Sequence, residues 1–275
     1  MQFTKKPISL AVANLKGGVG KTTTVASLAY ILGQKGYKIL AVDTDSQCNL
    51  TSLYKQDPDN IDKSIYEIMM EEANVNECII KDLETNVDLL PGSPSASTLD
   101  MKLAAKLRKE SLIDTAVKAL EKEYDFIIYD TAPALNLLTM NVFITSDEII
   151  IPAEADVFSL KAIYSMKETI DEVRKYHTLG ILGILLTRVE RLSGDKQIMD
   201  NSEQLAEIFE TKTFKNYIKA QKNVKASRLE STNVVKYSEE NRRKGHNDAG
   251  QDYERFADEM LKNLEVKYGN STEQN

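Results

Sequence analysis

An apolar run, a glycine-rich turn and a helix-like segment follow one another near the start of this chain of 275 residues. The apolar run covers residues 8–15, the helix-like segment covers 23–34, and the turn reads Lys16-Gly17-Gly18-Val19-Gly20-Lys21-Thr22-Thr23. Strand, glycine-rich turn, Lys-Thr and helix in this order are typical of the phosphate-binding loop, whose backbone N–H groups surround a polyphosphate at a helix N-terminus. The general pattern is G-x-x-x-x-G-K-[ST], and Leu15 stands at its first glycine position.

The residue types of this loop predict their roles. The glycines permit positive φ and a close approach of the backbone to phosphate oxygens. Lys21 is predicted to reach the β- and γ-phosphates, and the Thr22 hydroxyl to ligate Mg²⁺. The residues predicted to bind the nucleotide are Gly17, Gly18, Val19, Gly20, Lys21, Thr22 and Thr23. A second lysine, Lys16, brings more positive charge than one triphosphate normally needs from its own subunit.

This loop resembles the deviant phosphate-binding loop of the ParA/MinD family of ATPases, in which the early lysine is the signature residue. In that family the early lysine crosses a dimer interface and touches the nucleotide of the partner subunit. The resemblance implies ATP and Mg²⁺ as cofactors. It also implies catalytic roles for Lys16, acting on the partner's nucleotide, and for Lys21, acting on the nucleotide of its own subunit.

Asp130 ends the apolar run Phe126-Ile127-Ile128-Tyr129, which is a Walker B pattern and predicts a carboxylate for Mg²⁺. The next residues, Thr131-Ala132-Pro133, resemble the switch segment of the family. The alternative for Asp130 is an aspartate that caps the end of a strand and has no role in metal binding.

A second acidic segment, Asp43-Thr44-Asp45-Ser46-Gln47, resembles switch I of the family. The resemblance implies that Asp45 orients or activates the attacking water and that Asp43 supports the magnesium shell. The alternative for Asp45 is an Asx turn. For a further acidic pair, Glu154 and Asp156, we expect solvated carboxylates in a loop.

Apolar segments alternate with helix-like segments along the chain. The predicted strands are 8–15, 38–43, 87–90, 126–130, 148–152, 181–187 and 214–218. The predicted helices are 23–34, 64–72, 98–107, 112–123, 160–176, 196–209 and 252–266. Continuously apolar inner strands predict an α/β fold: a doubly wound, mainly parallel sheet with helices on both faces. We expect one P-loop ATPase domain over residues 1–267 and a polar, disordered tail over residues 268–275.

Composition narrows the class of protein. Hydrophobic residues make up 42% of the chain, enough to bury one substantial core. An apolar span of about 18 residues is absent and residues 1–7 lack the apolar segment of a signal peptide, so we expect a soluble, cytoplasmic protein. The cysteines, Cys48 and Cys78, lie far apart and suggest neither a zinc site nor a disulfide framework.

A basic strip contrasts with the net charge of −7. The stretch from residue 212 to residue 228 contains six cations and no acid: Lys212, Lys215, Lys219, Lys222, Lys225 and Arg228. Phosphate backbones bind such strips without reading the base sequence, through counterion release. The residues predicted to contact DNA are Lys215, Lys219, Lys222, Lys225 and Arg228. The alternative is a solvated basic face. A second cluster, Arg242-Arg243-Lys244, adjoins two glutamates and is the weaker candidate.

The resemblance to the ParA branch covers nearly the whole chain, including residues 87–93, 148–152 and 248–253. Residues 223–227, Asn-Val-Lys-Ala-Ser, resemble a family segment whose basic residues contact non-specific DNA. The loop begins at Lys16, which leaves no room for the N-terminal helix-turn-helix domain of one ParA class. We therefore do not expect this chain to bind a specific operator.

The resemblance implies a ParA-type DNA-partitioning ATPase. ATP with Mg²⁺ would join two subunits into a homodimer that binds DNA non-specifically and so associates with the nucleoid. A ParB-like centromere-binding protein would then stimulate the weak ATP hydrolase activity, dissolve the dimer and release the DNA during plasmid or chromosome segregation.

Three other classes share parts of this pattern. A MinD-like, membrane-associated positioning ATPase requires a C-terminal amphipathic anchor, and residues 265–271 supply none. A redox enzyme similar to the nitrogenase iron protein requires two cysteines near the switch loops, and neither Cys48 nor Cys78 stands at the cluster positions of that family. A relative of the tyrosine autokinases requires a C-terminal tyrosine cluster, where this chain has only Tyr268.

Overall fold

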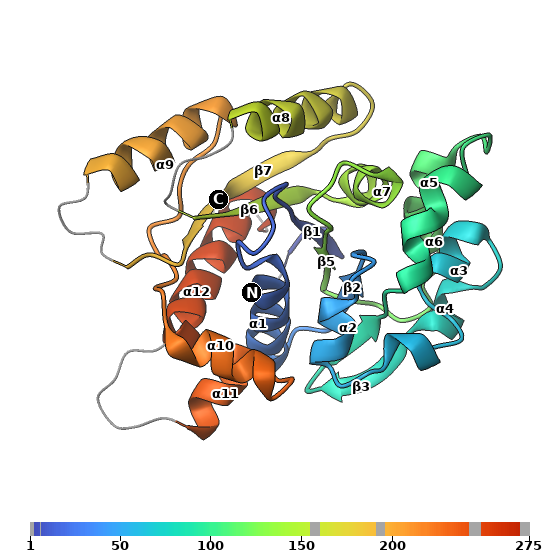
Figure 1. Cartoon of the computed structure of the whole chain (residues 1–275), viewed down its shortest axis with the longest axis horizontal. Coiled ribbons are helices and arrows are strands. Elements are labelled where there is room, and N and C mark those ends of the chain that lie inside the picture. Colours follow the sequence, from blue (N-terminus) through green and yellow to red (C-terminus); the bar gives the residue numbers. More distant parts are fainter. Residues whose placement is uncertain (1–2, 6, 155–159, 191–195, 242–248, 270–275) are drawn as a thin grey trace, which may run out of the picture.

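The computed structural model describes residues 3–5, 7–154, 160–190, 196–241 and 249–269, without the side chains of residues 196–199 and 228. Within these residues, seven strands form one sheet in the order β3-β4-β2-β5-β1-β6-β7. The strands are β1 (Ile8–Val12), β2 (Ile39–Asp43), β3 (Ile80–Glu84), β4 (Val87–Leu90), β5 (Phe126–Asp130), β6 (Glu148–Glu154) and β7 (Gly180–Thr187). Every neighbouring pair is parallel except β3 with β4. The predicted doubly wound, mainly parallel sheet is confirmed (Figure 1).

Helices cover both faces of this sheet because successive residues of its buried strands point to opposite sides. One face packs against α1 (Lys21–Gln34), α2 (Asn49–Leu53), α10 (Lys222–Leu229), α11 (Val234–Glu240) and α12 (Ala249–Tyr268). The other face packs against α3 (Ile65–Met70), α4 (Val75–Cys78), α5 (Leu99–Lys102), α6 (Leu112–Lys118), α7 (Leu137–Thr145), α8 (Leu160–Arg174) and α9 (Lys196–Ile208). In β1, Leu10 and Val12 join the first core, whereas Ala11 joins the second.

One predicted strand is absent and one strand was missed, while β1 ends at Val12, three residues before the predicted end, and β6 continues two residues past its predicted end. The segment 214–218 is not a strand. Its backbone bonds to β7 do not form a continuous ladder, and isolated bridges lie only at its two ends, at Thr213 and Lys219. Phe214 and Ile218 are buried. Strand β3 was not predicted. It is an antiparallel edge strand whose residues are half-buried or exposed, so it lacks the continuous apolar pattern of the inner strands.

The predicted helix over 98–107 is too long. A 3₁₀ turn, Pro94–Thr98, leads into the short helix α5, which ends at Lys102. Leu103 is buried, but Ala104, Ala105 and Leu107 are exposed, so the continuation has no apolar face to pack. Helix α6 likewise ends at Lys118, short of the predicted 123.

The last helix is longer than the sequence pattern indicated. Helix α12 continues to Tyr268, whose hydroxyl donates a 2.6 Å hydrogen bond to Glu148 Oε1, and Gly269 forms a bridge with Phe3. The expected disordered tail is therefore wrong for Tyr268 and Gly269, which this packing against β6 orders. Residues 270–275 lie outside the described residues.

Candidate functional site

The order of the strands brings the sequence motifs to one edge of the sheet. Strand β5 lies between β1 and β2, so that Asp130 is in register with Val12 on one side and with Asp43 on the other. The carboxyl ends of three adjacent strands therefore bring together the loop after β1, Asp130 at the end of β5 and the segment 43–47 at the end of β2. This edge is where open α/β sheets bind their ligands.

The loop has the backbone that the sequence predicted. Gly18 and Gly20 adopt φ of 79° and 93°, in the left-handed region that favours glycine, and α1 begins directly afterwards at Lys21. The Thr187 hydroxyl, at the end of β7, donates a 2.9 Å hydrogen bond to the carbonyl oxygen of Val19. Thr187 thus holds the middle of the loop against the sheet, a contact that nothing in the sequence indicated.

Lys21 is buried, with 7% of its surface exposed. Its ammonium group donates to the carbonyl oxygens of Asn14 and Lys16, at 3.0 and 3.3 Å. Burial lowers the pKa of Lys21, while the nearby carboxylates of Asp130 and Asp45 oppose this effect. The ammonium is thereby held within its own loop, next to the helix N-terminus that is predicted to receive the phosphates.

Asp130 is almost fully buried, and neither of its carboxylate oxygens has a hydrogen-bond partner within the described residues. Burial and the neighbouring Asp43 raise its pKa well above the ordinary value, against the opposing influence of Thr22 and Lys21. A buried carboxylate without a partner is costly. A cation held between Asp130 and the Thr22 hydroxyl would remove that cost, so these residues fit Mg²⁺. Within the described chain, no group of three or more His, Cys, Asp or Glu side chains is placed to hold a metal ion.

Asp43 and Asp45 are placed differently. Both oxygens of Asp43 already accept hydrogen bonds: Oδ2 from the hydroxyl and backbone N–H of Thr51, at 2.7 and 2.8 Å, and Oδ1 from the backbone of Asp45. Asp43 therefore anchors α2 to the end of β2, and burial raises its pKa. Asp45 is half-buried, and its Oδ1 accepts a 3.0 Å hydrogen bond from the backbone N–H of Gln47. This bond forms the Asx turn that the sequence offered as the alternative role of Asp45.

A cavity of about 380 Å³ lies over the loop. Its walls include three loop glycines, Lys21 and Thr22, together with Asp45 and Gln47 of switch I, Asn49, Ser52 and Leu53 of α2, Pro133 of the predicted switch segment, and Ser231. The predicted catalytic and nucleotide-binding side chains Lys21, Thr22 and Asp45 thus share one cavity. Lys16 does not line it.

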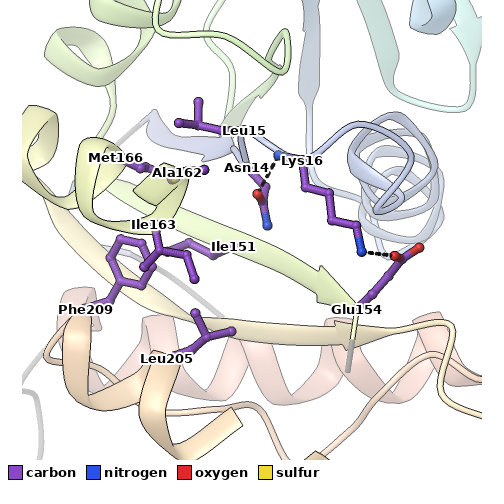
Figure 2. Close-up of a pocket in the computed structure, with 10 residues that line it drawn as sticks. All are labelled: Asn14, Leu15, Lys16, Ile151, Glu154, Ala162, Ile163, Met166, Leu205 and Phe209. Atoms are coloured by element: carbon purple, nitrogen blue, oxygen red, sulfur yellow. Dashed lines mark hydrogen bonds and ion pairs between the residues drawn. The ribbon is translucent and has the colours of Figure 1, made fainter. Parts of the chain in front are cut away.

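The Lys16 side chain instead runs from the loop to the end of β6 (Figure 2). Its ammonium group forms a 2.5 Å ion pair with Glu154 Oε2, and Arg188 holds the other carboxylate oxygen at 2.6 Å. The expectation of a solvated loop carboxylate is therefore wrong for Glu154, which is buried and paired because it ends β6 rather than lying in a loop. Asp156 lies outside the described residues.

The basic strip divides into two parts. Lys215 and Lys219 lie on the segment beside β7, where their backbone N–H groups donate to Glu259 and Asp252 of α12. Lys222 and Lys225 are exposed on one side of α10, and neither has an ion-pair partner among the residues that the structure describes. Arg228 also lies on α10. The strip is thus partly helical, and residues 242–244 of the weaker cluster lie outside the described residues.

The two cysteines are free and buried. Burial raises their pKa values, to about 12 for Cys48 and about 11 for Cys78. Enclosed thiols of this kind are inert and are poorly placed to share a cluster between subunits, which argues against the iron-protein alternative. No helix in the described part of the chain combines the length and the apolar character that crossing a bilayer requires.

Comparison with known proteins agrees with the geometry. A family model described as an AAA domain matches residues 8–181. The sporulation initiation inhibitor protein Soj of Bacillus subtilis is 30% identical over 212 residues, which cover 76% of this chain and 83% of Soj. The chromosome partitioning protein ParA of Myxococcus xanthus is 33% identical over 180 residues, 65% of this chain and 64% of that protein.

Among solved structures, cobyrinic acid a,c-diamide synthase from Mycobacterium smegmatis, with a bound ATP analogue and magnesium, superposes with a TM-score of 0.79. It is 26% identical, and the match covers 96% of this chain and 97% of that chain. The matching family model, the 30% identity to Soj over most of both chains and the shared P-loop fold point to one conclusion. The chain belongs to the ParA/MinD family of ATPases, in its Soj-like branch.

Proposed function

We propose that this chain is a ParA-type DNA-partitioning ATPase with weak, partner-stimulated hydrolysis. Two subunits join face to face when each binds ATP and Mg²⁺, and the homodimer binds DNA without sequence preference, which places it on the nucleoid. A ParB-like centromere-binding protein stimulates hydrolysis, after which the subunits separate and release the DNA. The identity to Soj and to a chromosome partitioning ParA supports the partition role.

One observation carries the dimeric part of the proposal. The two lysines of the loop face different places: Lys21 is buried and lines the cavity over its own loop, whereas the side chain of Lys16 lies outside that cavity and is 43% exposed. In this subunit Lys16 pairs with Glu154 rather than lining the cavity over the loop, and in the proposed dimer it reaches the nucleotide of the neighbouring subunit. There it neutralises part of the charge of the bound triphosphate.

Within each subunit the proposed roles follow from position. The loop N–H groups and Lys21 would bind the phosphates, and Thr22 and Asp130 would hold Mg²⁺. Asp43, in register with Asp130 on the adjacent strand, would support them. Bound Mg²⁺ would supply positive charge that offsets the negative charge of the phosphates. Asp45 lies in the same cavity and orients the attacking water, which is chiefly a positioning role in phosphoryl transfer.

A DNA mobility-shift assay tests this proposal. The protein is titrated onto a duplex of arbitrary sequence without nucleotide, with ADP, with ATP and with a slowly hydrolysed ATP analogue. We expect binding with ATP and stronger binding with the analogue, because only the triphosphate couples the two subunits. Equal binding in all four conditions, or none in any, would contradict the proposal.

The MinD-like alternative receives no support from the last helix. Phe256, Met260 and Leu264 of α12 are buried against the sheet, so the apolar face of this helix is already used within the described fold. Flotation with anionic vesicles in the presence of ATP distinguishes the two functions, since we expect the protein to remain in the unbound fraction.

A further inference from the structure

The sheet topology brings three charged side chains of the loop region together. Strands β6 and β7 are parallel, with Glu154 in register with Thr187, so Arg188 follows directly beside the end of β6. Strand β6 also pairs with β1, and the amide of Asn14, beyond the end of β1, donates a 2.7 Å hydrogen bond to the Pro152 carbonyl. The loop that follows is thus fixed within reach of Glu154.

The carboxylate of Glu154 lies between two cations. Lys16 holds Oε2 at 2.5 Å and Arg188 holds Oε1 at 2.6 Å, while only 10% of the Glu154 side chain is exposed. Burial disfavours the charged form, but the hydrogen bonds and charges of Lys16 and Arg188 outweigh it, so the pKa of Glu154 lies below its ordinary value. The Glu154 carboxylate therefore keeps one cationic partner, Arg188, when Lys16 leaves.

An apolar cavity lies beside the ion pair of Lys16 and Glu154. Lys16 and Glu154 form one wall of a cavity of about 170 Å³ whose other walls are mainly apolar, contributed by β6, α8 and α9 (Figure 2). Charges beside an apolar wall attract more strongly than charges in open water. Glu154 therefore competes effectively for the ammonium group of Lys16.

Two observations describe the position of Arg188 beside the loop. Its φ is 54°, in the left-handed region that non-glycine residues seldom adopt. Its guanidinium lies over the loop, because a Cβ added at Gly18 would be 4.0 Å from both terminal nitrogens. The side chain thus reaches across the loop to Glu154, although 57% of it is exposed.

We propose that Glu154 and Arg188 are positioning residues that control the release of Lys16 to the partner subunit. This inference rests on the proposed ATP-dependent dimer. Glu154 holds Lys16 within its own subunit until the triphosphate of the partner displaces it. Arg188 then remains as the counter-ion of Glu154, so the departure of Lys16 does not leave a buried carboxylate unpaired, which would be strongly unfavourable.

This proposal predicts opposite effects for two substitutions. Glu154→Gln frees Lys16 and should lower the dissociation constant of the dimer by roughly tenfold, because two lysines are released per dimer and each partly exposed ion pair contributes a few-fold. Arg188→Gln makes Lys16 the sole partner of Glu154 and should raise that constant by a similar factor. Arg188→Lys, which keeps the charge, should stay near the wild type.

Sedimentation velocity with a slowly hydrolysed ATP analogue measures these constants, and thermal melting confirms that each variant is folded. The double variant Glu154→Gln with Arg188→Gln should lose the defect of Arg188→Gln alone, since no buried carboxylate then needs a partner. Shifts of Glu154→Gln and Arg188→Gln in the same direction, with a wild type that dimerises, would overturn this inference and leave the proposed function intact.

A second measurement does not depend on dimerisation. The full chain without nucleotide is acetylated with a limiting amine reagent, and the labelling of Lys16 is followed by peptide mass spectrometry relative to the exposed Lys262. Labelling of Lys16 should rise several-fold in Glu154→Gln and not in Arg188→Gln. Equal labelling of Lys16 in the wild type and in Glu154→Gln would overturn the holding contact. A wild type that never dimerises contradicts the proposed function instead.

Discussion

Lys21 is the residue on which nucleotide binding depends most directly. Its ammonium group is buried at the start of α1 and lines the cavity over the loop. Lys21→Ala should abolish detectable ATP binding by isothermal titration calorimetry, because the phosphates lose their main positive counter-charge. Lys262→Ala, which removes an exposed lysine of α12, serves as the control and should bind like the wild type. Retained ATP affinity in Lys21→Ala would contradict the assignment of the loop.

Asp45 is the residue on which ATP hydrolysis is proposed to depend. It shares the cavity with Lys21 and Thr22 but contributes to neither the loop nor the sheet. Asp45→Ala should bind ATP and dimerise, yet lose phosphate release by about 100-fold or more, as expected when a positioning carboxylate is removed. Phosphate release is measured after ATP addition, with and without DNA. Turnover at the wild-type rate would assign Asp45 to its Asx turn alone.

At the residue scale, the sequence predicted site residues that lie in contiguous motifs. It did not predict contacts between residues that only tertiary packing brings together. Lys21 and Thr22 were predicted because strand, loop and helix lie consecutively in the chain, and Asp130 because it ends an apolar run. The pairing of Glu154 with Arg188 depends on the register of β6 against β7, and that of Thr51 with Asp43 on the position of α2. No spacing in the sequence indicates either pair.

Among the elements, α10 is the one whose role is most readily tested. Lys222 and Lys225 lie three residues apart on one side of this helix and are exposed. Changing both to Glu should weaken binding to duplexes of every sequence alike. Losing two phosphate contacts should also flatten the log–log dependence of affinity on salt by roughly 1.8 per subunit.

The matched control carries the same change of charge elsewhere, at Lys81 of β3 and Lys262 of α12, both exposed. If binding to DNA is governed by α10, this control should retain most of the affinity and the salt slope of the wild type. An equal loss in both variants would mean that net charge, rather than this helix, governs the interaction.

The elements were predictable where burial is continuous. Strands β4 and β5, buried throughout, match their predicted bounds, whereas β1 and β6, also buried throughout, were predicted with different ends. The edge strand β3 was not predicted, because its exposed residues interrupt the apolar pattern. Residues 214–218 mimic a strand because Phe214 and Ile218 fill the core beside β7 without a continuous ladder. Apolar periodicity reports burial and does not distinguish a strand from an extended segment.

At the scale of the whole molecule, α12 joins the end of the described chain to the core. Phe256 is fully buried, and its ring meets that of Phe214 edge-on at a centroid distance of 4.9 Å. Phe256→Ala should lower the free energy of unfolding by about 3–5 kcal/mol. Val266→Ala, on the same helix but 91% exposed, should change it by less than about 0.5 kcal/mol. Urea unfolding followed by circular dichroism measures both, and equal effects would contradict the docking of α12.

In the proposed function, ATP controls pairing of the subunits through Lys16. The most direct measurement is the molar mass in solution, by size exclusion with light scattering, for the wild type and Lys16→Ala with no nucleotide, ADP and a slowly hydrolysed ATP analogue. We predict a mass of two chains for the wild type with the analogue alone, and of one chain for Lys16→Ala in every condition, although it still binds the nucleotide. A wild type that stays at one chain with the analogue, or a Lys16→Ala variant that still doubles its mass, would contradict the account.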